Sequence, residues 1–148
     1  MEIKIENANL RLLDALYRIE EQCFDAEAFT KRQIAYLLTD YNIIALVAKD
    51  GPNIAGFIIV QVETDDLGFG HIITINVAQK YRGRKVATCL LEEIERLLKQ
   101  RGANECRLEV REDNHAAINL YQKLGYQRIG KLERYYDSKH GLYFKKPL

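Results

Sequence analysis

A strand pattern that runs through a short cationic loop into a long amphipathic helix pattern is the feature that most constrains this chain. Residues 71–77 (HIITINV) have the composition of a strand, and residues 86–98 repeat apolar side chains at helical spacing. The apolar stripe consists of Val86, Ala87, Leu90, Leu91, Ile94, Leu97 and Leu98. Gly102 predicts the end of this helix, because glycine is favoured just beyond helix C-termini.

Similar patterns fill the rest of the chain. Strand patterns cover residues 3–5, 43–49, 53–63, 105–111, 126–136 and 142–146. Helix patterns cover residues 10–24, 30–38 and 114–124, and Thr30 with Gln33 forms a capping-box sequence at the start of the second. The resulting order, β-α-α-β-β-β-α-β-α-β-β, predicts an α/β fold (an α+β mixed sheet) with helices on both faces. No linker or repeat interrupts it, so we expect one domain over residues 1–148.

The balance of charge argues against two classes of partner. The formal net charge is +1, so no overall field attracts nucleic acid or an acidic membrane surface. A nucleic-acid-binding module would spread basic and aromatic residues along one face, and no such patch is visible. The chain is charged from Glu2, unlike a signal peptide, and its longest apolar run, IAGFIIV, is too short to span a bilayer. We therefore expect no nucleic acid and no membrane as partners.

The cysteines and histidines are scattered. Cys23, Cys89 and Cys106 are odd in number and lie in apolar stretches, which indicates reduced thiols and a cytoplasmic protein. The three histidines stand far apart, with no ligand spacing among themselves or with the cysteines. We expect no metal site.

The loop QKYRGRK places cations where a helix begins. A helix N-terminus already has free N–H groups and a partial positive charge, so it is a ready anion site. Gly83 lets the backbone turn, and Arg82, Arg84 and Lys85 add charged donors. A phosphate or pyrophosphate is the natural ligand; the other interpretation is a solvated loop that balances the acidic helix behind it. Neither GxxxxGK[ST] nor GxGxxG occurs, so a P-loop and a dinucleotide fold are unsupported.

Two blocks of the second half, INVAQKYRGRKVATCLLEEI and RLEVREDNHAAINLYQKLGY, resemble the GNAT family of acyl-CoA-dependent N-acetyltransferases. The first is similar to the pyrophosphate motif Arg/Gln-x-x-Gly-x-Gly/Ala. The second is similar to Asn-x-x-Ala-x-x-Leu-Tyr-x-x-x-Gly-Phe/Tyr of the ribosomal-protein and N-terminal (RimI-like) acetyltransferase branch. The resemblance covers nearly the whole chain and implies the GNAT fold with acetyl-CoA as acetyl donor. Lys85 stands where the family usually has glycine, and we expect it to adopt helical φ there.

The resemblance also implies how acetyl-CoA lies. The central strands of the family splay apart, and the pantetheine arm pairs with the exposed strand edge, here Ile75, Asn76 and Val77. The pyrophosphate rests on the loop and the first helical turn, which are Arg82, Gly83, Arg84, Lys85, Val86 and Ala87. Asn114 would contact the cofactor, and it is also a good helix N-cap.

The same branch points to Glu109 as general base and Tyr121 as general acid. Each has a plainer interpretation: Glu109 alternates with Arg107 and Arg111 on a charged strand face, and Tyr121 lies on an apolar helical stripe. Cys89 and Cys106 are alternative nucleophiles, but neither has a neighbouring histidine in sequence. We expect direct attack by the amine rather than a cysteine intermediate.

In the family, the loop between the first two helices and the last hairpin frame the acceptor. Here they read CFDAEAFTK and RYYDSKHG. Phe29, Tyr135 and Tyr136 would wall in the acceptor, and acidic residues would attract a cationic amine: Glu21, Asp25 and Glu27. The YY pair is similar to N-terminal acetyltransferases, whereas AEAF and SKHG replace the usual Pro-Trp or Pro-Tyr and the Gly-Glu-Asp-Ala turn.

A protein or peptide N-terminus is therefore the first acceptor that we expect. A small amine (a polyamine or an amino sugar) is the alternative within the enzyme class. A non-catalytic CoA-binding regulatory domain is the alternative outside it. The sequence is compatible with a monomer or a homodimer.

Overall fold

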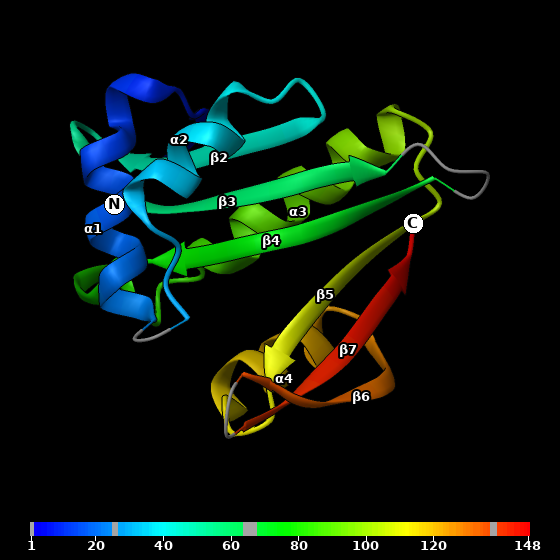
Figure 1. Cartoon of the computed structure of the whole chain (residues 1–148). Helices are drawn as coiled ribbons and strands as arrows, with labels where there is room; N and C mark the ends of the chain where they lie inside the picture. Colours follow the sequence, from blue (N-terminus) through cyan, green and yellow to red (C-terminus); the bar gives the residue numbers. More distant parts are fainter. Residues whose placement is uncertain (1, 25–26, 64–67, 137–138) are drawn as a thin grey trace.

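A single mixed sheet organises the computed structural model, which describes residues 2–24, 27–63, 68–136 and 139–148. Within these residues seven strands lie in the order β1-β2-β3-β4-β5-β7-β6 (Figure 1). The strands are β1 (Ile3–Asn7), β2 (Ile43–Asp50), β3 (Asn53–Glu63), β4 (Phe69–Val77), β5 (Glu105–Arg111), β6 (Gln127–Tyr136) and β7 (Lys139–Pro147). β4 and β5 pair in parallel and every other pair is antiparallel.

Four α-helices connect the strands within the described residues. They are α1 (Leu13–Cys23), α2 (Lys31–Thr39), α3 (Val86–Gln100) and α4 (His115–Lys123), with short 3₁₀ turns at Leu10–Leu12 and Gln79–Tyr81. The predicted order of elements is confirmed, and so is the capping box: Thr30 Oγ1 accepts from the Gln33 N–H, and Gln33 Oε1 accepts from the Thr30 N–H. None of the described helices has the length and apolar character needed to cross a bilayer.

The helices cover both faces of the sheet, as predicted. Leu16, Ile19 and Ile34 of α1 and α2 pack on Val47, Phe57 and Ile59 of β2 and β3. The opposite face is covered by α3 and α4, and the apolar stripe of α3 supplies much of that core. Burial of these stripes is the main stabilising contribution available to such a fold.

The sheet splits in its middle. β4 pairs with β5 only from Phe69–Glu105 to His71–Arg107, and the two strands then diverge (Figure 1). β4 keeps its pairing with β3, and β5 keeps its pairing with β7. Each strand therefore has one satisfied edge and one edge that faces the gap.

An irregularity in β4 determines which of its side chains face α3 and which face α1. The β3–β4 register shifts between Ile59 and Val60, so that Ile73 is an extra residue. Ile72 packs on the α3 side, whereas Ile73 packs on the α1 side. The bulge thereby reverses the alternation, and Thr74 and Asn76 point towards Glu20 of α1.

Candidate active site

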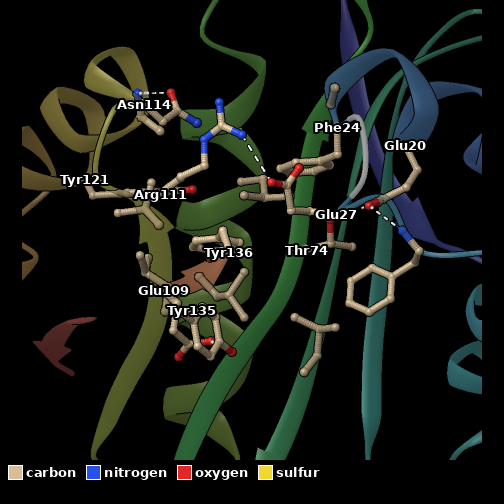
Figure 2. Close-up of a pocket in the computed structure, with 18 of the residues that line it drawn as sticks. Glu20, Phe24, Glu27, Thr74, Glu109, Arg111, Asn114, Tyr121, Tyr135 and Tyr136 are labelled. Atoms are coloured by element: carbon tan, nitrogen blue, oxygen red, sulfur yellow. Dashed lines mark hydrogen bonds and ion pairs between the residues drawn. The ribbon is translucent and has the colours of Figure 1, made fainter. Parts of the chain in front are cut away.

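A cavity of about 450 Å³ lies where β4 and β5 diverge (Figure 2). Residues Ile72–Ile75 of β4 and Leu108–Arg111 of β5 form two of its walls. The remaining described lining comes from the α1–α2 region, α4 and the last hairpin, and comprises Glu20, Cys23, Phe24, Glu27, Phe29, Asp113, Asn114, Ala117, Tyr121, Tyr135 and Tyr136. Residues predicted from distant parts of the sequence thus meet around one cavity.

Glu109 lies in the β5 wall with only 11% of its side chain exposed. Its two carboxylate oxygens are 2.8 and 2.9 Å from Nε2 of His71, the last β4 residue paired with β5. An ionised carboxylate can only accept hydrogen bonds, so Nε2 of His71 must carry the proton and donate it in this contact. The Tyr135 hydroxyl donates to the same carboxylate at 3.4 Å. Glu109 is therefore held by His71 of β4 and Tyr135 of β6. Its neighbours on β5 pair close to themselves in sequence: Arg107 with Glu105, and Arg111 with Asp113.

His71 was missed by the sequence analysis as a partner of Glu109. The two residues are 38 positions apart and share no local motif. Only the parallel pairing of His71 with Arg107 brings them together, two residues before Glu109 on β5.

Tyr121 is 6% exposed, on α4, and lines the cavity. Its ring packs edge-on against Tyr126, with centroids 5.9 Å apart, so it belongs to the core as well. Burial raises the pKa of its phenol, which keeps the hydroxyl protonated at neutral pH. No hydrogen-bond partner for that hydroxyl is present among the residues that the structure describes.

Asn114 caps α4, because its Oδ1 accepts from the Ala117 N–H at 3.2 Å. This fulfils the capping role expected of it, and Asn114 also lines the cavity. The helix cap uses only Oδ1, so the side-chain NH2 group of Asn114 is not involved in capping.

Glu20 is a carboxylate that the fold buries at the cavity wall, with 1% exposure. Thr74 and Asn76 donate to Oε1 at 2.9 and 3.0 Å, and the Phe29 N–H donates to Oε2 at 3.2 Å. Burial raises the pKa of Glu20, and these three donors oppose that rise. The network ties α1, β4 and the segment before α2 together.

An ion pair spans the mouth of the cavity. Arg111 Nη1 of β5 lies 3.1 Å from Glu27 Oε1, before α2, and Figure 2 shows the pair facing across the gap. Arg111 also binds Asp113 with two nitrogens and lowers the pKa of that carboxyl. Glu27, expected to attract an amine, is thus paired with a cation. Glu21 is exposed and absent from the described lining, and Asp25 lies outside the described residues.

The predicted acceptor side chains lie on two sides of the cavity. Phe29 belongs to the segment before α2, and Tyr135 and Tyr136 end β6. The two tyrosine rings are perpendicular, with centroids 4.9 Å apart. Burial raises the pKa of both phenols, and Glu109 adds to the rise. The structure brings these three residues together with Glu109, although the hairpin residues 137 and 138 lie outside the described part.

The cationic loop ends at the N-terminus of α3, as predicted. Arg82 folds back on the end of β4: its Nε lies 3.5 Å from the Val77 carbonyl oxygen and its Nη2 lies 3.6 Å from Cys23 Sγ. Gly83 is in the left-handed region and no heavy atom lies near the position of its missing side chain, so the backbone there is open to a ligand. Val86 and Ala87 begin the helix.

The expected helical φ of Lys85 is wrong. Lys85 is the N-cap of α3 with φ 63° and ψ 22°, in the left-handed region. That region is costly for a residue with a Cβ and free for glycine. The position therefore favours glycine for a conformational reason, and this chain adopts the same turn with a lysine.

The β4 edge predicted to pair with a ligand faces the gap along Ile75–Val77. The side chain of Asn76 is not available there, because it is 2% exposed and donates to Glu20 and Thr74. Only the backbone of Asn76 can serve a ligand at this edge. Its Oδ1 is buried without a partner among the described residues.

The cysteine alternatives, Cys89 and Cys106, lie outside the described lining of the cavity. Cys106 is fully buried, and burial raises the pKa of its thiol to about 12. Cys89 is exposed, and neither residue belongs to the described cavity lining. Neither of these two thiols therefore lies where a covalent intermediate could form in the cavity.

Comparison with known proteins identifies the family of the chain. Residues 13–126 match the acetyltransferase (GNAT) family. The chain is 30% identical to an N-alpha-acetyltransferase of Sulfurisphaera tokodaii over 96% of this chain and 90% of that protein. It is 32% identical to a putative [ribosomal protein bS18]-alanine N-acetyltransferase of Bacillus subtilis over 90% and 87%.

Solved structures show the same fold. The ribosomal-protein-S18-alanine N-acetyltransferase of Escherichia coli superposes with a TM-score of 0.89, at 26% identity, over 99% of this chain and 94% of that one. A NatC complex bound to Gag peptide and CoA contains a chain with a TM-score of 0.89 at 22% identity, covering 100% and 99%. The chain belongs to the GNAT family and is an N-acetyltransferase that transfers an acetyl group from acetyl-CoA to an amine.

Proposed function

We propose that the acceptor is the α-amine of a protein N-terminus, acetylated by direct attack on acetyl-CoA in a ternary complex. The observation that carries this proposal is the cavity in which Glu109, Tyr121 and the Tyr135–Tyr136 pair meet. Relatives at 30–32% identity that are named N-alpha-acetyltransferases support it.

Acetyl-CoA, the acetyl donor, would bind to the free edge of β4 and to the N-terminus of α3. The pantetheine arm would pair with the free β4 edge at Ile75–Val77, as an added strand does. The pyrophosphate would bind at the N-terminus of α3, where the first helical turn has backbone N–H groups without intrahelical partners and the preceding loop adds cations. The thioester then lies in the cavity between β4 and β5.

The chemistry needs two proton transfers. The amine must lose a proton before or while its nitrogen attacks the thioester carbon, and Glu109 can accept it directly or through water. His71 and Tyr135 hold the carboxylate in place. When the C–S bond breaks, the thiolate takes a proton from Tyr121, whose hydroxyl has no competing partner among the described residues. Each role is typically worth 10²–10⁴-fold in rate.

The acceptor side suits a peptide backbone. Glu109 is the carboxylate of the lining best placed to favour an ammonium group, because Glu27 is paired with Arg111 and burial raises the pKa of Glu20. Tyr135 and Tyr136 offer flat apolar surfaces with polar tips, which suits a backbone and a first side chain. The three free cysteines support a reducing compartment, and we propose the cytoplasm.

Mass spectrometry of separate acceptors tests the proposal. Wild-type protein and acetyl-CoA are incubated with a peptide that has a free N-terminus, the same peptide with a blocked N-terminus and an internal lysine, a polyamine, and an amino sugar. We expect acetylation of the free N-terminus alone or much faster than the rest. Acetylation of only the polyamine, the amino sugar or the lysine would replace the N-terminal proposal by one of the alternatives.

Tyr136 provides a sharper test of the peptide site. Tyr136→Ala should raise the KM for the peptide and leave the KM for acetyl-CoA unchanged, because the ring lines the acceptor side of the cavity. Tyr36→Ala is the matched control, since Tyr36 is 70% exposed on α2 and outside the described lining. Equal peptide KM values in the two variants would remove Tyr136 from the acceptor site.

A further inference from the structure

The last hairpin contains an irregularity that lies beside the tyrosine pair. The β6–β7 register passes from Leu132–Gly141 to Tyr136–Lys139, which is four positions along β6 but only two along β7. β6 therefore bulges by two residues just before its end. Arg134 lies in this bulge with φ 50°, a left-handed conformation that is costly for arginine. Such a conformation persists only where contacts with the surrounding structure stabilise it.

His140 provides the holding contact. Its Nδ1 accepts a hydrogen bond from the Arg134 N–H at 3.0 Å. Its carbonyl oxygen accepts from the Glu112 N–H, also at 3.0 Å, which anchors His140 to the turn after β5. The imidazole thus satisfies the backbone donor of the strained residue from a fixed position on β7.

The bulge determines where the tyrosine rings lie. A Cβ on Gly141 would lie 3.1 Å from atoms of Tyr135 and 3.2 Å from Tyr136, so both side chains rest directly on the β7 backbone there. In the same arrangement the Tyr135 hydroxyl reaches Glu109. The hairpin therefore links the acceptor wall to the carboxylate that would accept the proton.

We propose that His140 is the positioning residue of the acceptor site: its neutral ring holds the β6 bulge that places Tyr135 and Tyr136 in the cavity wall, and its protonation releases them. The proposal rests on the proposed function, because it takes these tyrosines as the acceptor wall. Only an unprotonated Nδ1 has the lone pair that the Arg134 N–H needs. Acceptor binding should accordingly weaken when this ring is protonated.

The charged surroundings of His140 are mixed. The Arg134 N–H donates to it from β6, Lys139 precedes it on β7, and the Glu112 N–H donates to its carbonyl oxygen. The Glu112 carboxylate in turn lies 3.9 Å from Nζ of Lys131. His140→Ala and His140→Asn keep all four of these charges and therefore isolate the ring itself.

Three variants test the contact through kinetics. His140→Ala removes the acceptor atom; His140→Asn supplies an amide oxygen that accepts without titrating; Arg134→Gly keeps the N–H and suits the left-handed conformation. We expect a severalfold higher peptide KM in His140→Ala, recovery in His140→Asn, a normal value in Arg134→Gly, and an unchanged acetyl-CoA KM throughout. The wild-type to His140→Asn ratio of peptide KM values should rise as pH falls, because the two proteins differ in no other titratable group. A normal KM in His140→Ala, no recovery in His140→Asn, or a pH-independent ratio would overturn the proposal.

A second measurement does not depend on the acceptor. Nitrogen-15 NMR of the wild-type protein should show the His140 proton on Nε2 and slow exchange of the Arg134 amide. The protection should be lost in His140→Ala or at low pH, and kept in His140→Asn. If no peptide is acetylated but the NMR pattern holds, the proposed function fails while the role of His140 in the hairpin stands. Fast Arg134 exchange in the wild type would overturn that role whatever the acceptor is.

Discussion

At the scale of single residues, Glu20 shows how burial and hydrogen bonding compete. The carboxylate is almost fully buried and accepts from Thr74, Asn76 and the Phe29 N–H, yet its pKa remains above the ordinary value because burial outweighs these donors. With a raised pKa the folded state keeps a proton that the unfolded chain has already lost. The free energy of unfolding therefore falls as pH rises from the ordinary carboxyl pKa through the raised one.

Glu20→Gln removes this titration while keeping an oxygen for Thr74 and Asn76. We expect the unfolding free energy of the wild type, relative to the variant, to decline as pH rises above the ordinary carboxyl pKa of about 4.3. Urea unfolding of both proteins at a series of pH values measures it. A difference that is constant with pH, or that grows in favour of the wild type as pH rises, would show that the Glu20 pKa is not raised.

Lys85 is a second residue whose backbone, more than its charge, determines its effect on stability. Lys85→Gly should raise the free energy of unfolding by about 0.5–1 kcal/mol, because the relief of a left-handed residue exceeds the entropic cost of glycine. Lys85→Ala is the control: it removes the same charge and keeps the conformational cost. If glycine and alanine shift stability equally, the left-handed conformation is not the cause.

At the scale of elements, the loop before α3 combines a helix N-terminus with Arg82, Arg84 and Lys85. Charge reversal of Arg82 and Arg84 to Glu should weaken CoA binding sharply, because a phosphate would then meet carboxylates. The melting temperature without ligand should change little. Titration calorimetry with CoA measures the affinity.

Lys4 and Arg11, both exposed and far from the loop in sequence, provide a control with the same change of net charge when replaced by Glu. This control should bind CoA like the wild type. Equal affinities in the loop variant and the control would place the pyrophosphate elsewhere.

The elements were predictable because their signals are local. The apolar stripe of α3, the Thr30–Gln33 capping box and Gly102 after α3 are each signals of a single element, and all three are found at the predicted positions. The contacts that complete the site are not local. His71–Glu109, Glu20–Asn76 and Arg111–Glu27 join residues 38, 56 and 84 positions apart, and no periodicity encodes such pairs.

The backbone irregularities were also beyond the sequence patterns. The bulge at Ile73 reverses the faces of β4, and the bulge before Tyr136 includes Arg134, whose N–H donates to His140. Lys85 gives no signal of a left-handed φ, because lysine is ordinary in helices. Resemblance to a family did name Glu109 and Tyr121, and the structure brings both to one cavity.

At the scale of the whole molecule, the split sheet is what makes a site possible. β3 satisfies one edge of β4, and β7 satisfies one edge of β5, so the two strands can separate without losing all their pairing. The gap then offers a cavity and a free edge of β4, and the chain continues from β4 to the N-terminus of α3. The central claim is that acetyl transfer takes place in that cavity with Glu109 as base and Tyr121 as acid.

Measurement of kcat against pH for Glu109→Gln and Tyr121→Phe, with the acceptor that the wild type acetylates, tests this claim most directly. Glu109→Gln should lose about 10²–10⁴-fold at low pH, where the amine is protonated, and should regain part of the loss as pH rises. Tyr121→Phe should lose a similar factor at all pH values below the raised pKa of the phenol, with near-normal CoA affinity, since only the proton donor is removed. Near-wild-type rates in Tyr121→Phe, together with an unchanged pH profile in Glu109→Gln, would contradict the claim and return both residues to structural roles.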